Sequence, residues 1–359
     1  MKIKANHLAK SHIPASHGGP FSIKNPDEKI VDFSSNVNPL GCYNGVKKFL
    51  KKQLNTISQY PDSESKKLRS NLKWYTGLAE SQIVIGNGAT EIIYNFCTAF
   101  LNKKTKVLIS IPTFSEYEKA ARLSGSKIIF YKTMNLNNNL SEFIKKIPNN
   151  GIVFVCNPNN PTGVIIPKIN LLKIVISAKK KSSIVFIDET FIELVPDSNE
   201  SLVKSIKHHN NLFILRSFTK SFGLAGIRIG YALGSKEIVS VLQRIKIPWN
   251  VSNIAQSAAS AAICYHPFLE KSKKLIKKEN DFLTKSISEL DKFSCYKSST
   301  NFLLLKTKIK SKTLQKKLLK NKILIRDCST FRGLNDSYVR IAVKTRKENI
   351  KLISALEAI

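Results

Sequence analysis

Residues 212–228 decide the fold and read LFILRSFTKSFGLAGIR. An apolar run is followed by Ser217, Thr219 and Lys220, and a glycine-containing turn then leads to Arg228. A lysine at the end of a buried strand, flanked by small hydroxyl residues, is in a setting where a lowered pKa lets the amine form a Schiff base. Arg228 adds a positive charge that disfavours the charged form of the lysine and can face an anion. The alternative is an ordinary surface lysine, because the chain carries 58 lysine and arginine residues.

Short β-branched runs alternate with longer amphipathic stretches around this segment. Predicted strands lie at 83–85, 106–111, 127–131, 152–156, 184–187 and 212–215, and predicted helices at 90–101, 115–124, 168–181 and 200–208. Most strand candidates are continuous apolar runs, as expected of strands that are covered on both faces. The alternation predicts an α/β fold with a mainly parallel sheet, whose catalytic groups gather at the carboxyl ends of the strands.

The pattern changes after residue 250. A helix of small residues, a long lysine-rich helix and a mixture of short strands and helices are expected at 254–263, 268–291, 301–305, 311–320, 323–325 and 338–343, followed by a last helix. We therefore expect three parts in the chain. They are an irregular N-terminal arm (1–35), a large α/β domain (36–250) and a smaller C-terminal α+β domain (251–359).

The composition disfavours several classes of protein. The chain has 359 residues, 42% of them hydrophobic, and a formal net charge of +33. The lysines are spread along the chain without a zinc finger, a basic leucine-zipper region or an RNA-binding aromatic motif, so we expect no nucleic-acid partner. No apolar run reaches the ~20 residues of a membrane span and no secretory signal is visible, so we expect no membrane association. The six scattered cysteines predict a reducing cytoplasm and neither a disulfide framework nor a metal site.

Two further motifs follow predicted strands. Asp188 closes the apolar run 184–187, where a buried carboxylate needs a partner. It can hold a ring nitrogen protonated and so make the ring an electron sink; a strand-end cap or a metal ligand is the alternative. The stretch NPNNPTG at 157–163 directly follows the predicted strand 152–156. From this position Asn160 can donate to an oxygen of the same ring. Alone, such a turn is a weak signal.

The stretch GNGATE at 86–91 lies between a predicted strand and a predicted helix. It does not match G-x-G-x-x-G, which disfavours a dinucleotide. A glycine-rich turn that opens a helix still presents free backbone N–H groups to a phosphate. Phe114, in Pro-Thr-Phe after the next strand, is placed to stack on a flat ring, although a core aromatic is the commoner case for such a residue.

The order of these motifs resembles that of the fold-type I pyridoxal-phosphate enzymes of the class I/II aminotransferase family, over nearly the whole chain from His17 to Arg340. The resemblance implies the transferase fold of that class and pyridoxal 5'-phosphate attached to Lys220, with Asp188 at the pyridine nitrogen. It implies a homodimer with the active site at the subunit boundary, where Tyr60 reaches the cofactor phosphate of the other subunit. It also implies further cofactor contacts from Gly88, Ala89, Thr90, Phe114, Asn160, Ser217, Thr219 and Arg228.

Two branches of this family compete, the histidinol-phosphate aminotransferases and the L-threonine-O-3-phosphate decarboxylases of cobalamin synthesis. Features that resemble the decarboxylases are HGG and DFSSNVNPLG at 17–19 and 32–41, Phe191 in place of the usual tyrosine, IPWNV at 247–251, and ILIRDC and FRGL at 323–328 and 331–334. Pro20 departs from the asparagine expected after His-Gly-Gly. The resemblance favours decarboxylation of L-threonine O-3-phosphate to (R)-1-amino-2-propanol O-2-phosphate. Transamination of histidinol phosphate with 2-oxoglutarate is the alternative.

Substrate contacts are expected mainly from the C-terminal part of the chain. Arg340 lies between two apolar strand residues, a position that favours a buried anion over a surface ion pair. Arg340 and Arg326 are predicted to bind the substrate carboxylate, because a planar guanidinium matches a carboxylate bidentately. By the resemblance, His17 and Asn36 are candidates for binding the substrate phosphate. A non-catalytic regulatory or nucleic-acid-binding protein is disfavoured because the key lysine, aspartate and asparagine are all present.

Overall fold

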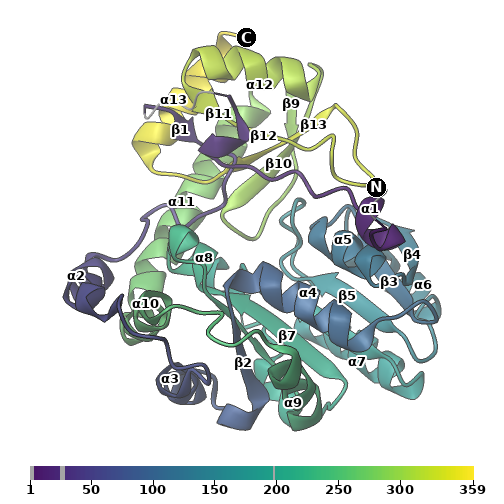
Figure 1. The fold of residues 1–359 in the computed structure, drawn as a ribbon. Coiled ribbons are helices and arrows are strands. Elements are labelled where there is room, and N and C mark those ends of the chain that lie inside the picture. The colour runs from purple at the N-terminus through teal and green to yellow at the C-terminus, as the bar shows by residue number, and fades with distance from the viewer. Residues whose placement is uncertain (1–3, 25–28, 197–198) are drawn as a thin grey trace.

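The structure is a computed structural model that describes residues 4–24, 29–196 and 199–359 (Figure 1). A large sheet with helices on both faces forms one end of the molecule, and a smaller sheet with its own helices forms the other (Figure 1). The long helix α11 (Phe268–Ser288) runs between the two ends. This is the expected α/β architecture with a smaller α+β part at the C-terminus.

The large sheet has seven strands in the described part of the chain, in the order β2-β8-β7-β6-β5-β3-β4. Their bounds are β2 (Ile83–Gly86), β3 (Lys106–Ile111), β4 (Lys127–Lys132), β5 (Ile152–Cys156), β6 (Ile184–Asp188), β7 (Leu212–Ser217) and β8 (Gly230–Leu233). In this sheet β8 runs in the direction opposite to that of the other six strands. The six strands predicted from the sequence are confirmed. The seventh, β8, was missed because its short Gly-Tyr-Ala-Leu run carries no β-branched signal.

Alternate residues of the central strands enter two separate cores. Val153 and Val185 face one core, where they pack with residues of α7 (Lys168–Lys180). Phe154 and Phe186 face the other, where α4 (Gly88–Phe100), α5 (Glu116–Leu123) and α9 (Lys236–Ile245) cover the sheet. This burial on both sides is why the strands read as continuous apolar runs. It also holds the strand ends, and the loops that follow them, in fixed positions.

The small sheet is antiparallel, in the order β12-β13-β10-β9. Its strands are β9 (Phe293–Cys295), β10 (Phe302–Thr307), β12 (Arg326–Asp327) and β13 (Tyr338–Ala342). Apolar residues of α11, α12 (Ser311–Lys320) and α13 (Arg346–Glu357) pack against it in a third core. The arrangement places Arg326 opposite Arg340 in register on neighbouring strands.

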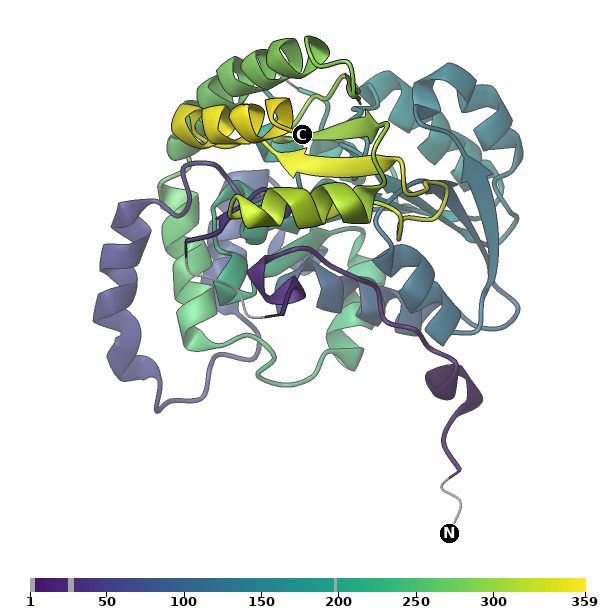
Figure 2. The ribbon, with the colours of Figure 1, turned by 90° about the horizontal axis from the view of Figure 1, so that it is seen from above.

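The N-terminal residues connect the two parts. The short strand β1 (Val31–Asp32) pairs in parallel with β11 (Ile323–Leu324), and Phe33 is fully buried in the small core. Before it, the chain contains α1 (His7–Lys10) and crosses toward the large sheet (Figure 2). Helix α10 (Asn253–Cys264) packs with α2 (Asn44–Gln53) and α3 (Lys66–Thr76) and joins a core of the large sheet. A domain boundary at residue 250 stays a proposal. The packing of α10 against the large part favours a boundary within α11 instead.

Some predicted helices differ from the structure. The helix expected at 200–208 is only a 3-10 segment, Val203–Lys207, because one short turn is enough to bury Val203 and Ile206. Helices α2, α3, α6 (Leu140–Lys145) and α9 were not predicted. The helices expected near 90–101, 115–124, 168–181, 254–263, 268–291 and 311–320 are confirmed, with ends shifted by up to three residues.

Candidate active site

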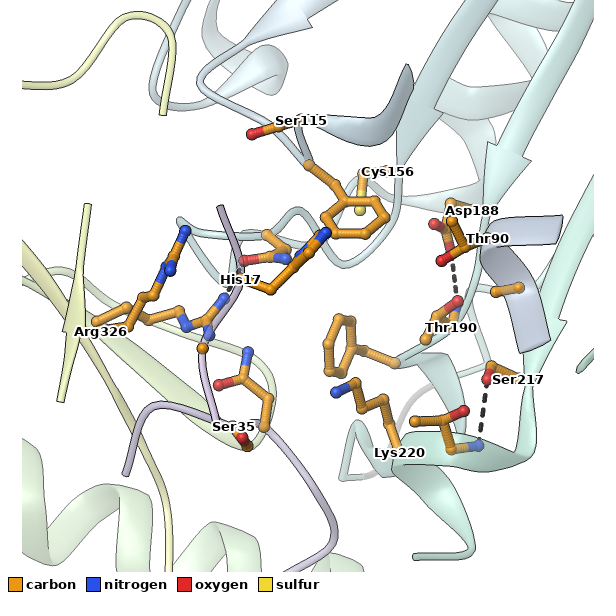
Figure 3. A pocket seen from close by; sticks show the side chains of 18 of the residues that line it. His17, Ser35, Thr90, Ser115, Cys156, Asp188, Thr190, Ser217, Lys220 and Arg326 are labelled. Carbon is orange, nitrogen blue, oxygen red and sulfur yellow. Dashed lines mark hydrogen bonds between the residues drawn. The ribbon is translucent and has the colours of Figure 1, made fainter. Parts of the chain in front are cut away.

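A cavity of about 290 Å³ lies at the carboxyl edge of the large sheet, and the small part and the N-terminal arm close its other side (Figure 3). Thirteen of the fifteen residues that the sequence singled out line it. They are His17, Asn36, Ala89, Thr90, Phe114, Asn160, Asp188, Ser217, Thr219, Lys220, Arg228, Arg326 and Arg340. Gly88 and Tyr60 are not among the lining residues.

Lys220 lies in the short helix α8 (Phe218–Ser221), directly after β7. Ser217 caps this helix by accepting a 3.1 Å hydrogen bond from the backbone N–H of Thr219. Burial, together with the positive charges of Arg340 and Arg228, lowers the pKa of Lys220 to about 8. With that pKa, roughly a tenth of the amine is neutral at pH 7, against far less for an exposed lysine. The site therefore supplies a nucleophilic amine.

Asp188 ends β6 and is almost fully buried. Burial raises its pKa, while the backbone N–H of Thr190 and the hydroxyl of Tyr117 oppose the rise by donating to its two oxygens at 2.9 and 2.6 Å. Figure 3 shows Asp188, Thr190, Ser217 and Lys220 on the same side of the cavity. A carboxylate held in this way can bind a protonated ring nitrogen.

Arg340 and Asn160 are hydrogen bonded inside the cavity. Nη1 of Arg340 donates to Oδ1 of Asn160 at 2.5 Å, and Nη2 donates to the carbonyl of Ser34 at 2.7 Å. Because arginine can only donate, the amide oxygen of Asn160 is taken and its NH₂ group remains for an acceptor in the cavity. Nε of Arg340 is buried and has no partner among the described residues. Burial also lowers the pKa of Arg340 to about 10.

The N-terminus of α4 and Arg228 form one end of the cavity. A Cβ atom built on Gly88 would lie 2.6 Å from Nη2 of Arg228, and Gly88 has φ +81°, so this position needs glycine on both counts. Gly88 does not line the cavity itself. Because it has no side chain, it allows Arg228 to lie against the N-terminus of α4. The first free N–H groups of a helix bind anions well, and Ala89 and Thr90 line the cavity there.

The N-terminal arm and the small part supply the opposite wall. Arg326 donates to the carbonyl of Ser16 at 2.6 Å and to the Thr330 hydroxyl at 3.2 Å. The His17 ring lies with Nε2 2.6 Å from Oε1 of Glu116, and Figure 3 shows His17 and Arg326 across the cavity from Lys220. Asn36 is buried, and its Oδ1 has no partner in the described part of the chain.

Tyr60 lies outside the cavity of its own chain. It is 82% exposed, and its ring contacts that of Trp249 with centroids 4.9 Å apart and planes tilted by 36°. Phe114 and Phe191 do line the cavity, and Phe191 also packs edge-on against Phe302. A role for Tyr60 in cofactor binding therefore needs a second subunit.

Sequence reasoning missed several residues that shape the site: Ser16, Glu116, Tyr117 and Thr190. Glu116 and Tyr117 open the helix after Phe114, so their place beside a predicted site residue was visible. Their partners His17 and Asp188 are far away in the sequence, and no local pattern indicates those contacts.

The donor set fits pyridoxal 5'-phosphate. A buried amine of lowered pKa, a buried carboxylate and a cationic helix N-terminus match the aldehyde, the pyridine nitrogen and the phosphate of that cofactor. The NH₂ group of Asn160 is the donor left for its phenolic oxygen. The fold and the cavity together therefore define a fold-type I pyridoxal-phosphate enzyme.

Comparisons with known proteins agree. Residues 28–356 match the family model described as aminotransferase class I and II, and the chain belongs to this family. A protein of Caldanaerobacter subterraneus subsp. tengcongensis that is provisionally named a threonine-phosphate decarboxylase is 35% identical, over 96% of this chain and 94% of its own.

Two solved structures are also similar. The histidinol-phosphate aminotransferase of Clostridium acetobutylicum is 33% identical with a TM-score of 0.85, over 92% of this chain and 98% of its own. The L-threonine-O-3-phosphate decarboxylase of Porphyromonas gingivalis is 29% identical with a TM-score of 0.83, over 92% of this chain and 99% of its own. None of the helices in the described part of this chain combines the length and apolar character of a membrane span.

Proposed function

We propose that this enzyme decarboxylates L-threonine O-3-phosphate to (R)-1-amino-2-propanol O-2-phosphate, a step of cobalamin synthesis in the cytoplasm. The observation that carries the proposal is a group of basic side chains in one cavity: Arg340 and Arg326, opposite each other on β13 and β12, and His17, which follows the Ser16 whose carbonyl Arg326 contacts. A substrate with both a carboxylate and a phosphate uses both arginines. Phe191 supports this choice, since the resembling aminotransferases usually carry tyrosine there.

The cationic groups orient the substrate. We assign the substrate carboxylate to Arg340, whose unpartnered Nε and neighbouring Nη group can donate to two oxygens side by side. We assign the phosphate to the wall of Arg326, His17 and Asn36. Arg326 is already oriented by the Ser16 carbonyl and the Thr330 hydroxyl, so its remaining donors are fixed before substrate binds.

Pyridoxal 5'-phosphate, when bound, supplies an electron sink for the bond that breaks at Cα. Tyr117 and Thr190 hold the Asp188 carboxylate, which would bind the pyridine nitrogen, and the Asn160 NH₂ group would donate to the phenolic oxygen. Lys220 would hold the cofactor, and its amine, once free, would be placed to return a proton to Cα after CO₂ leaves. Which bond at Cα stands perpendicular to the ring decides between decarboxylation and transamination.

We further propose a homodimer in which Tyr60 completes the site of the other subunit. Tyr60, Ile57 and Trp249 expose large apolar surfaces on one face of the large part, and such a patch favours a protein partner. The hydroxyl of Tyr60 then reaches the end of the neighbouring cavity formed by Arg228 and α4.

The alternative function is transamination of histidinol phosphate with 2-oxoglutarate. It is favoured by the 33% identity with the aminotransferase of Clostridium acetobutylicum, against 29% for the decarboxylase structure. The two arginines also fit the two carboxylates of 2-oxoglutarate. Incubating the cofactor-loaded protein with L-threonine O-3-phosphate separates the two functions. CO₂ release without a 2-oxo-acid supports the proposal, and activity only with histidinol phosphate and 2-oxoglutarate overturns it.

A further inference from the structure

An acidic side chain lies directly behind the anion-binding wall of the cavity. Glu116 is 4% exposed and is the first residue of α5. Its Oε1 lies 2.6 Å from Nε2 of His17, and its Oε2 accepts a 2.7 Å hydrogen bond from the Tyr94 hydroxyl. Both carboxylate oxygens are therefore engaged, one of them by a residue that lines the cavity.

The carboxylate is ionised in this position. Burial alone would raise the pKa of Glu116, but the hydrogen bonds from His17 and Tyr94 lower it below its usual value. The first turn of a helix also favours a negative charge. Glu116 does not itself line the cavity, where Asp188 is the acidic lining residue. Glu116 can therefore affect a bound ligand only through the His17 ring, which does line the cavity.

The hydrogen bond fixes what His17 presents to a ligand. With Nε2 held by a carboxylate, Nε2 carries a hydrogen, and Nδ1 is left on the other edge of the ring. Nδ1 has no partner among the described residues. Nδ1 can then form a hydrogen bond with a phosphate oxygen, with the hydrogen on either atom.

The backbone around His17 is fixed as well. Arg326 holds the carbonyl of Ser16 on one side, and on the other the Gly19 N–H donates to the Ser34 hydroxyl at 2.7 Å. A Cβ atom on Gly18 would lie 2.7 Å from the Ser34 carbonyl, so the chain passes close to it here. The remaining freedom of His17 is the rotation of its side chain, and Glu116 removes that freedom.

We propose that Glu116 is a positioning residue for phosphate recognition, which holds Nε2 of His17 so that Nδ1 forms a hydrogen bond with the phosphate of the substrate. The inference rests on the proposed function only in needing a phosphorylated amine as substrate. Histidinol phosphate meets that need equally well. Glu116 thereby contributes to discrimination between phosphorylated and unphosphorylated amines without touching either.

The test measures binding to the cofactor-loaded protein by calorimetry, with O-phosphoethanolamine and ethanolamine as probes. Neither probe has a carboxylate, so the binding of both is independent of whether the enzyme releases CO₂. In Glu116→Gln we expect the dissociation constant for O-phosphoethanolamine to rise about tenfold, the usual weight of a hydrogen bond to a charged group, with that for ethanolamine unchanged. Glu142→Gln, which removes a charge at an exposed and remote position, is the matched control.

A double-mutant cycle separates positioning from a general structural effect. In a His17→Ala background, Glu116→Gln should change the affinity for O-phosphoethanolamine by less than about twofold, because the residue on which it acts is gone. The inference is overturned if Glu116→Gln weakens both probes equally, if its effect persists in full without His17, or if the wild-type protein binds O-phosphoethanolamine no better than ethanolamine. Failure of the proposed function would appear instead as absent CO₂ release with the phosphate preference intact.

Discussion

The hydroxyl of Tyr117 donates a 2.6 Å hydrogen bond to Oδ2 of Asp188, and both side chains are buried at the edge of the large sheet. The Tyr117 ring is in turn stacked on Phe154, with centroids 5.2 Å apart and planes 11° from parallel. The phenol thus cannot turn away from the carboxylate. This pair sets how strongly the site can hold a protonated ring nitrogen.

Tyr117→Phe removes that donor and keeps the ring packing. We expect the pKa of Asp188 to rise further and cofactor affinity to fall by about tenfold, since a hydrogen bond to a buried charge is lost. The measurement is a fluorescence titration of apo-protein with pyridoxal 5'-phosphate. Tyr131→Phe, which loses a hydroxyl far from the cavity, is the control. Equal cofactor affinity in all three proteins would show that Tyr117 does not support Asp188.

The lowered pKa of Lys220 predicts a pH dependence for cofactor attachment. Only the neutral amine attacks an aldehyde, so the association rate of apo-protein with cofactor should rise with pH and level off above about 8. Arg340→Met removes a positive charge that lowers this pKa, so the midpoint should move to higher pH. Stopped-flow absorbance measures both profiles. A midpoint that stays in place would exclude electrostatic coupling between Arg340 and Lys220.

Phe191 lines the cavity and has no group that can donate a hydrogen bond. A tyrosine at this position would donate to the phenolic oxygen of the cofactor and lower the basicity of its bond to Lys220. Phe191→Tyr should therefore move the midpoint of the visible absorbance titration of the loaded enzyme to lower pH. Identical midpoints in the two proteins would count against this role for position 191.

Arg332 connects the loop of the small part to the large part. Its Nε and Nη2 donate to Glu118 at 2.7 and 2.8 Å, and its guanidinium lies over the Phe130 ring at 4.6 Å. The neighbouring Phe331 lines the cavity. Because the arginine is half exposed, Arg332→Ala should cost less than about 1 kcal/mol of unfolding free energy.

The same variant should raise the KM for the substrate severalfold, because the loop that carries Phe331 loses its attachment. Steady-state kinetics and urea unfolding measure the two effects. Lys310→Ala, which removes an exposed cation with a 3.9 Å ion pair in the small part, is the control. A KM equal to that of the wild type would mean that the loop holds its place without Arg332.

Phe114, Asn160, Asp188 and Lys220 were predictable because each of them ends or follows a strand with a continuous apolar run. Such runs end at one edge of a parallel sheet, so Asp188 and Lys220 had to meet there. Local patterns cannot say which of two adjacent polar residues faces the site. Glu189, next to Asp188, instead forms a buried ion pair with Arg216 at 2.8 Å.

Contacts between distant segments could not be predicted. The partnership of His17 with Glu116 depends on the arm crossing from the small part to α5, and nothing in either local sequence specifies that path. The pairing of β1 with β11 is similar, since two residues on each strand carry too short a pattern to read. Both features follow from tertiary packing alone.

The central claim is that Lys220 carries the cofactor, within reach of Asp188. The most direct measurement is to load the protein with pyridoxal 5'-phosphate, reduce it with borohydride, digest it and locate the pyridoxyl group by mass spectrometry. The account predicts a single modified peptide that contains Lys220, and loss of the modification in Lys220→Ala. A pyridoxyl group on another lysine, or labelling that Lys220→Ala leaves unchanged, would contradict it.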